Sequence, residues 1–145
     1  MFETPQWREN WRAIGPPDAV AVRLPRSRSA RAAAKRRLAD VPRGTGVVLS
    51  ASAPGARRRC EGFAADCGIE LDRQYLAFPS ARAPCYLVED DQASVKYFVS
   101  SALVAPPDTP MFTMVDAVLA AVRRFSPWRL VRWLSPGRMV VGWRS

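Results

Sequence analysis

Two short stretches of the chain place arginine and serine side chains where an apolar run gives way to a predicted helix. One stretch, 25–29, reads Pro-Arg-Ser-Arg-Ser and follows the apolar run 19–24. The other, 50–55, ends in Pro-Gly and is soon followed by three consecutive arginines. Free backbone N–H groups and the positive end of the helix dipole favour anions at helix starts, so both stretches predict a phosphate or carboxylate site. The predicted ligand-binding residues are Arg26, Ser27, Arg28, Ser50, Ser52 and Gly55.

Ordinary helix capping is the alternative explanation of both stretches, and it stays open. A serine before a helix usually accepts a hydrogen bond from one of the first backbone N–H groups. Neither stretch matches the G-x-G-x-x-G or Walker A pattern of a phosphate-binding loop. Acidic residues are the ones normally favoured at a helix start, so the arginines are the observation that a bound anion would explain.

An acidic triplet, 89–91, stands where a predicted strand ends and a predicted helix begins. Carboxylates complement the dipole at a helix start, so capping is one explanation of the triplet. The alternative is a metal or ribose-hydroxyl site, because adjacent carboxylates suit Mg²⁺ together with a phosphorylated substrate. Asp90 and Asp91 are also the catalytic candidates, since the chain has no histidine and a general base would be a carboxylate of raised pKa.

The missing histidine excludes Ser-His and Cys-His nucleophile pairs and histidine metal ligands. Cys60, Cys67 and Cys85 show no metal-binding spacing, so the sequence predicts no metal site and indicates no particular cofactor. Cys60 and Cys67 share one face of a predicted helix with Phe63 and Ala64, which favours inert core positions. An odd cysteine count and the lack of a signal-peptide pattern at the start are typical of a cytoplasmic protein with reduced thiols.

The stretch 125–134 mixes aromatic, aliphatic and arginine side chains and contains no acidic residue. Indole rings favour the headgroup region of a bilayer, and arginine binds lipid phosphates. Tryptophan and arginine are equally favoured at protein interfaces. Packing of one face on the core, with solvated arginines on the other, is the third explanation. For a membrane or protein partner, the expected contact residues are Trp128, Arg129, Arg132 and Trp133.

Charge is unevenly distributed along the chain, whose formal net charge is +9. Residues 1–59 carry 13 basic and 4 acidic side chains, residues 60–116 carry 3 and 9, and residues 117–145 carry 6 and 0. Arginine outnumbers lysine 20 to 2, a bias typical of GC-rich bacterial codons, so part of the basicity is compositional. The acidic middle and the lack of helix-turn-helix, zinc-finger or RRM patterns make nucleic acid a less favoured partner than a small anion.

Apolar runs bounded by turn residues predict strands that alternate with helices. This alternation indicates one α/β domain over 1–145, a Rossmann-like three-layer sandwich with a mostly parallel sheet. The short connector 79–84, with proline at both ends, predicts an antiparallel hairpin at a sheet edge. The expected strands are 19–24, 47–50, 71–78, 85–88 and a short final strand 139–143; the expected helices are about 27–39, 55–67, 90–103, 109–125 and 127–134, between an N-terminal arm 1–18 and a Trp/Arg-rich segment 126–145.

The strand–helix alternation with a late hairpin resembles part of a Rossmann-type transferase, such as a class I methyltransferase. No glycine-rich loop follows the first strand, so the resemblance implies a reduced relative without a complete S-adenosylmethionine site. We expect a small bacterial domain that binds a phosphorylated or nucleotide-like small molecule, as a transferase-like protein of a biosynthetic pathway. The alternative is a non-catalytic adaptor that docks peripherally on a membrane or on a protein partner through 126–145. The oligomeric state does not follow from the sequence.

Overall fold

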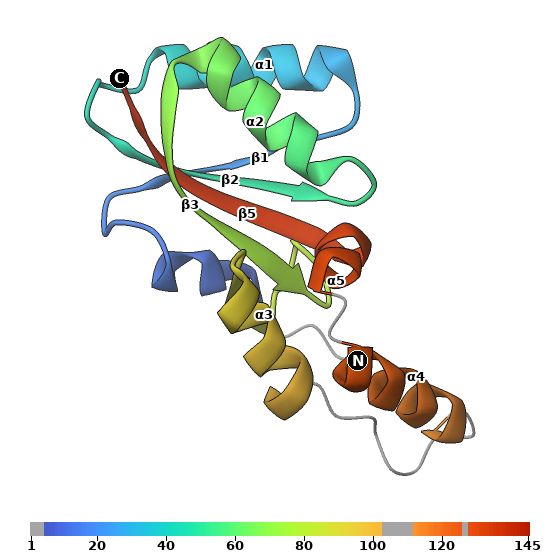
Figure 1. Ribbon diagram of the computed structural model, residues 1–145. Coiled ribbons are helices and arrows are strands. Elements are labelled where there is room, and N and C mark those ends of the chain that lie inside the picture. Colours follow the sequence, from blue (N-terminus) through green and yellow to red (C-terminus); the bar gives the residue numbers. More distant parts are fainter. Residues whose placement is uncertain (1–4, 103–111, 126–127) are drawn as a thin grey trace. The chain divides into compact units, whose positions relative to one another are not determined.

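The computed structural model describes residues 5–102, 112–125 and 128–145, and the chain divides into two compact units (Figure 1). One unit consists of residues 1–87 and 135–145, and the other of residues 88–134. The predicted helix starts at Thr109-Pro110 and Ser126-Pro127 lie outside the described residues. The single domain inferred from the sequence stays a prediction.

The first unit opens with a short 3₁₀ helix and then a parallel strand–helix–strand arrangement. The 3₁₀ helix spans Pro5–Ala13. β1 (Val20–Arg23) leads through α1 (Arg28–Ala39) to β2 (Gly46–Ser52), and the two strands pair in parallel. Ser27 is the N-cap of α1, because its side chain accepts a hydrogen bond from a first-turn amide. This part of the chain has the crossover that the sequence pattern predicted.

α2 (Ala56–Cys67) follows β2 and leads directly into β3 (Ile69–Phe78). The helix ends at Gly68, whose φ of 63° lies in the left-handed region that favours glycine. Cys60 and Phe63 both point into the core, as their helical spacing predicted. Figure 1 shows α1 and α2 side by side over the same face of the sheet.

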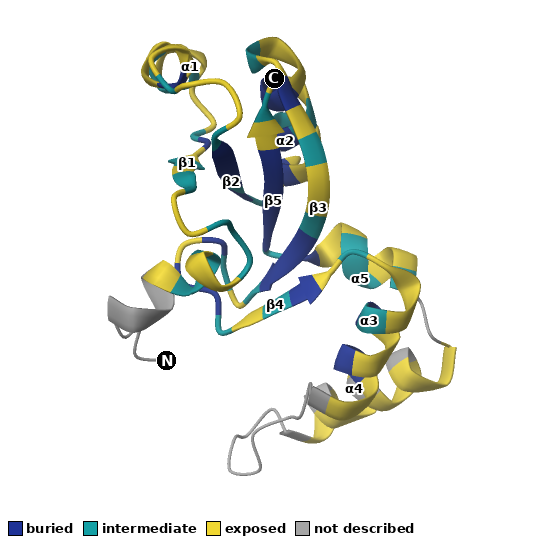
Figure 2. Ribbon diagram, turned by 90° about the vertical axis from the view of Figure 1, so that its left-hand side faces the viewer, coloured by how far each residue is buried: buried dark blue, intermediate teal, exposed yellow. Residues whose placement is uncertain are grey.

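β5 (Gly137–Arg144) shows that the expectation of a mostly parallel sheet is wrong. It lies between β2 and β3 and is antiparallel to both, so the five-stranded sheet of the described residues has the order β1-β2-β5-β3-β4. The predicted final strand therefore exists, but it is longer and occupies the centre. The reason is its apolar run, 139–141, which is buried on both faces and needs a neighbour on each side and a covering layer on each face. Figure 2 shows β2 and β5 as the most buried strands.

The two faces of the sheet bury separate clusters of side chains. Leu49 and Val140 belong to the cluster beneath α1 and α2, which also contains Leu38 and Phe63. On the other face, alternate residues of the same strands pack with Trp11 of the 3₁₀ helix. The side chains of that second cluster are Val48, Tyr75, Ala77, Ala81, Met139 and Val141. The N-terminal segment thus covers the face that α1 and α2 leave open.

The end of β5 holds the C-termini of both helices. The Arg144 guanidinium donates to the carbonyl groups of Leu38 and Ala39 at the end of α1. The hydroxyl and the amide of Ser145 both donate to the Gly68 carbonyl just beyond α2, at 2.7 and 2.9 Å. α1 and α2 are therefore tied to the same central strand.

β4 (Tyr86–Glu89) lies beside β3 at the edge of the sheet, which confirms the predicted edge position. The backbone amide of Cys85 donates to the Phe78 carbonyl at 2.7 Å and closes the connector between the two strands. The boundary between the two units, at residues 87 and 88, falls within β4.

The second unit is helical, as predicted for this part of the chain. α3 (Gln92–Tyr97) continues into a π-helical turn (Phe98–Ala102), and α4 (Phe112–Phe125) and α5 (Trp128–Leu134) complete it. Val95, a residue of α3, is fully buried.

Gly142 lies opposite a bulge in β3, where the register shifts between Leu71 and Arg73. A Cβ at position 142 would stand 2.5 Å from the carbonyl oxygen of Glu70, a backbone atom that cannot rotate away. We expect Gly142→Ala to lower the free energy of unfolding by about 1–3 kcal/mol. Urea denaturation followed by circular dichroism measures this loss.

Gly62→Ala is the matched control for the same substitution. Gly62 lies on the exposed side of α2, and no atom stands within 4 Å of the Cβ that alanine would add. Alanine is favoured over glycine inside a helix by about 0.5–1 kcal/mol, so this variant should become more stable. Equal destabilisation by the two substitutions would contradict the close approach of β5 and β3.

Candidate anion-binding site

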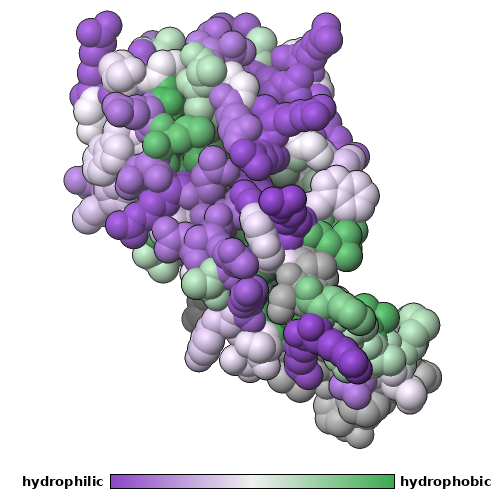
Figure 3. All heavy atoms as spheres, viewed as in Figure 1, coloured by the Kyte–Doolittle hydropathy of each residue, from purple (hydrophilic) through white to green (hydrophobic). Residues whose placement is uncertain are grey.

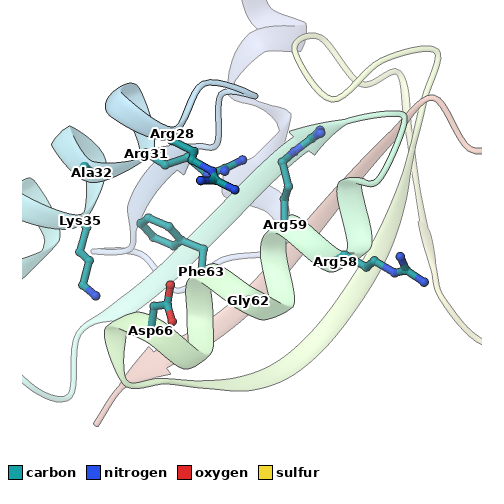
Figure 4. A pocket seen from close by; sticks show the side chains of 9 residues that line it. All are labelled: Arg28, Arg31, Ala32, Lys35, Arg58, Arg59, Gly62, Phe63 and Asp66. Carbon is teal, nitrogen blue, oxygen red and sulfur yellow. The ribbon is translucent and has the colours of Figure 1, made fainter.

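A cleft of about 420 Å³ lies between α1 and α2. Arg28, Arg31 and Lys35 of α1 line one wall. Their spacing of i, i+3 and i+7 places all three cations on one face of the helix, over about 10 Å of its length. Figure 4 shows Arg28 and Arg31 reaching toward α2, and Figure 3 shows hydrophilic side chains gathered over this part of the unit. Positive charge therefore runs along the whole α1 wall.

The opposite wall is formed by α2. Arg58 and Arg59 supply two more cations, and Asp66 supplies a carboxylate about two helical turns further on. Phe63 is 6% exposed, and its ring lies between the two walls in Figure 4 as an apolar floor. Gly62 has no side chain, which leaves the middle of this wall open.

Arg59 is the most restrained cation of the cleft. Its Nη1 donates to the Pro54 carbonyl at 2.8 Å, and its Nη2 donates to the Ser52 carbonyl. Its Nε is buried and has no hydrogen-bond partner among the described residues. Burial, followed by the positive charges of Arg26 and Arg31, lowers the pKa of Arg59 from its ordinary value. The partly buried position of the guanidinium is thus the main cause of the lowered pKa, and the neighbouring arginines add to it.

The five cations of the cleft are not neutralised by ion pairs. None of them pairs with a carboxylate in the part of the chain that the structure describes, and Asp66 is the one acidic residue of the lining. Guanidinium groups bind phosphate through paired, charge-assisted hydrogen bonds. The described lining has no hydroxyl, thiol or second carboxylate, so it can bind and orient an anion but holds no acid–base pair.

Of the predicted ligand-binding residues, Arg28 lines the cleft. Arg26, at the start of α1, donates to the carbonyl of Ala53 instead. The Ser27 hydroxyl accepts from the Ala30 amide and lies 2.8 Å from the Ser29 hydroxyl. Arg26 and Ser27 thus stabilise the local chain next to the cleft.

The predicted residues of the second stretch lie outside the cleft lining. Ser50 is a β2 residue that pairs with Met139 of β5. Ser52 offers its carbonyl to Arg59, and Gly55 is the N-cap of α2 with a left-handed φ of 72° and no side-chain cap. The loop 52–54 therefore presents carbonyl oxygens to two arginines, Arg26 and Arg59, and its fold depends on them.

The two catalytic candidates, Asp90 and Asp91, both have partners within the second unit. Asp90 pairs with Arg132, with 2.9 Å between Oδ2 and Nη2, and its side chain is 4% exposed. Asp91 is the N-cap of α3 and accepts hydrogen bonds from the amides of Ala93 and Ser94. The hydrogen bonds from Ser94 lower the pKa of Asp91, whereas a general base at neutral pH would need a raised pKa.

The predicted membrane or partner residues lie together on α5. The guanidinium groups of Arg129 and Arg132 lie over the Trp128 ring, 5.4 and 5.1 Å from its centroid. Trp133 is 78% exposed. Arg132 and Trp128 are therefore engaged within the second unit, while Trp133 faces solvent.

The sequence reasoning missed Arg31, Lys35, Arg58 and Arg59 as cleft residues. The i, i+3, i+7 spacing of Arg28 with two of them is a signal that could have found the α1 wall. The three consecutive arginines after Gly55 mark the α2 wall in the sequence, but packing decides which of them turn toward the cleft.

Among the described residues, no group of three or more His, Cys, Asp or Glu side chains could hold a metal ion. Within the same residues, no helix has both the length and the apolar character needed to cross a bilayer. No family model or curated protein matches the sequence, and no solved structure matches the fold. What the chain does is therefore inferred from the geometry and charge of its own surfaces.

Cys60 lies on the buried side of α2, and its side chain is fully buried. Burial raises the pKa of its thiol to about 12, although the charges of Arg138 and Arg59 favour the thiolate. The folded state thus keeps a proton that the unfolded state releases above pH 9. We expect the resulting stability to be present below pH 9 and lost as the pH rises toward 12.

Urea denaturation of the wild type and of Cys60→Ala at a series of pH values measures this loss. The difference in unfolding free energy between the two proteins should shrink above pH 9, because the variant lacks the thiol. A difference that stays constant with pH would contradict the raised pKa. Iodoacetamide should also leave Cys60 unmodified in the native protein and label it in urea.

Proposed function

We propose that the first unit binds a phosphorylated small molecule in the cleft between α1 and α2. The observation that carries the proposal is that five cations, unpaired with any described carboxylate, line one cavity. Such a concentration of like charge is costly to hold together, and a phosphate group relieves it while filling the guanidinium hydrogen bonds.

The size of the cleft favours a small ligand over a nucleic acid. Its volume of about 420 Å³ falls within the range of small-molecule sites. Binding to a nucleic-acid backbone rewards a continuous basic track, whereas here Asp66 closes one end of the lining. A ligand with two linked phosphates would match the row formed by Arg28, Arg31 and Lys35.

A narrower proposal is that this unit belongs to a cytoplasmic, transferase-like bacterial protein of a biosynthetic pathway. The parallel β1–α1–β2 arrangement supports it, because nucleotide-binding α/β folds are built from such units. A Rossmann-like three-layer arrangement is part of the same proposal. The described lining holds one carboxylate, that of Asp66, and no acid–base pair, so transfer chemistry would depend on groups supplied by the ligand, a cofactor or a partner.

Pyrophosphate is the probe that tests the cleft, with binding followed by isothermal titration calorimetry. The double variant Arg28→Ala/Arg31→Ala should weaken binding about tenfold or more, because hydrogen bonds to charged groups contribute about 1.5–3 kcal/mol each before solvent screening. Comparison with a nucleoside 5′-diphosphate shows whether the ligand needs more than its phosphates.

The double variant Arg36→Ala/Arg37→Ala is the matched control. Both arginines are exposed residues of α1 outside the lining, so this variant removes the same charge from the same helix. Its affinity for pyrophosphate should change by less than about threefold, the screened effect of remote charges. If the two double variants weakened pyrophosphate binding equally, the binding would be non-specific electrostatic attraction, and the proposed site would be wrong. Tight, sequence-independent binding of an oligonucleotide would replace the small molecule with a nucleic acid.

A further inference from the structure

The second unit exposes an apolar stripe along α4. Met114, Val118 and Phe125 are 59%, 56% and 76% exposed, and Ala121 between them is exposed as well. Their spacing of i, i+4, i+7 and i+11 places the four side chains on one face of the helix. Figure 3 shows apolar side chains on the visible side of α4. Large apolar side chains aligned in this way are unusual on a surface that meets only water.

α5 continues the pattern in the next helix of the chain. Leu130, Trp133 and Leu134 are 45%, 78% and 61% exposed, with the i, i+3, i+4 spacing of a single face. Trp133, with its large apolar ring and its N–H donor, suits a boundary between an apolar phase and water. We name these residues of α5 and the α4 stripe, which are two helix faces of the same unit, together the exposed apolar face.

The charges beside this face are positive. Arg124, exposed in the last turn of α4, flanks the stripe three residues after Ala121. Arg129 lies four residues before Trp133, on the same side of α5. Asp116, the acidic residue of α4, is two residues from both Met114 and Val118 and so lies away from the stripe.

From this combination we propose that the second unit docks on the surface of an anionic lipid bilayer. Apolar side chains would enter the region between headgroups and acyl chains, while the flanking guanidinium groups meet lipid phosphates. Charge complementarity selects this occupant. A second copy of the same face would place Arg124 and Arg129 opposite other arginines, because residues 117–145 contain no acidic side chain. The proposal involves a different unit from the cleft and does not depend on the proposed function.

The orientation of α5 depends on residues that would not touch lipid. Arg132 pairs with Asp90, which lies outside α5, so this pair anchors α5 to the rest of the unit. The Arg123 guanidinium donates to the Val99 carbonyl at 3.3 Å. Arg124 and Arg129 are therefore the arginines that would contact lipid phosphates.

Co-sedimentation of the full chain with vesicles tests the proposal. Vesicles of phosphatidylcholine and phosphatidylglycerol should bind the protein, and vesicles of phosphatidylcholine alone should bind it at least about tenfold more weakly, since each basic residue near an anionic surface adds about 1 kcal/mol. The tryptophan emission should shift to shorter wavelength on binding. Raised salt should weaken the binding to anionic vesicles.

Trp133→Ser/Leu134→Ser should lower vesicle binding at least about tenfold, because it removes two exposed apolar groups that would enter the bilayer. Tyr97→Ser is the matched control, because Tyr97 is a 71% exposed aromatic residue of the same unit on α3. Circular dichroism confirms that each variant is folded. Equal binding by the wild type and Trp133→Ser/Leu134→Ser would overturn the proposal.

Three other outcomes would also overturn it. One is failure of the wild type to sediment with anionic vesicles in low salt. Another is concentration-dependent self-association that Trp133→Ser/Leu134→Ser abolishes, which would make a second copy the occupant. The third is vesicle binding that depends on Arg28 and Arg31 and not on Trp133, which would place lipid phosphate in the cleft. The last outcome would leave the proposed function standing while removing this inference.

Discussion

The antiparallel insertion of β5 between β2 and β3 is the constraint on which the first unit depends. Without β5, the parallel β1–β2 pair and the strand β3 would have no shared backbone hydrogen bonds. The strand is buried over six of its eight residues, and its alternate side chains complete the clusters on both faces. It also carries Arg138 into the interior, where the guanidinium donates to the Gln74 side chain at 3.0 Å. Its close approach to β3 requires glycine at position 142.

The cleft is a consequence of the same strand. α2 packs on β2 and β5, and the last two residues of the chain bind the C-terminal carbonyl groups of α1 and the residue after α2. The cation row of α1 and the arginines of α2 line the cleft between the two helices that are held in this way. Arg26 and Arg59 hold the loop between β2 and α2 through its carbonyl oxygens. Arginines of this unit therefore stabilise the loop between β2 and α2 and also give the cleft its positive charge.

The uneven charge along the chain corresponds to two different surfaces. The basic residues 1–59 include α1 and the start of α2, whose cations line the cleft above the Phe63 ring. The basic last fifth forms α4, α5 and β5, where the exposed arginines stand beside exposed Met, Val, Phe, Leu and Trp side chains. In the acidic middle, two of the nine carboxylates have structural roles, because Asp90 pairs with Arg132 and Asp91 caps α3. The uneven charge thus underlies both proposals, a compact phosphate in the cleft and an anionic lipid surface at the second unit.

The sequence by itself determined which segments are helices and strands, because those depend on local periodicity, caps and turn residues such as Ser27 and Gly68. It also determined that Cys60 and Phe63 share a buried face, and that no histidine chemistry occurs. Only the tertiary structure decided that β5 lies at the centre, since strand order depends on packing between residues far apart in the chain. The same holds for the cleft. Arg28 alone of the predicted anion ligands lines it. The other lining cations depend on which sides of α1 and α2 face each other, and the core beneath the two helices sets that.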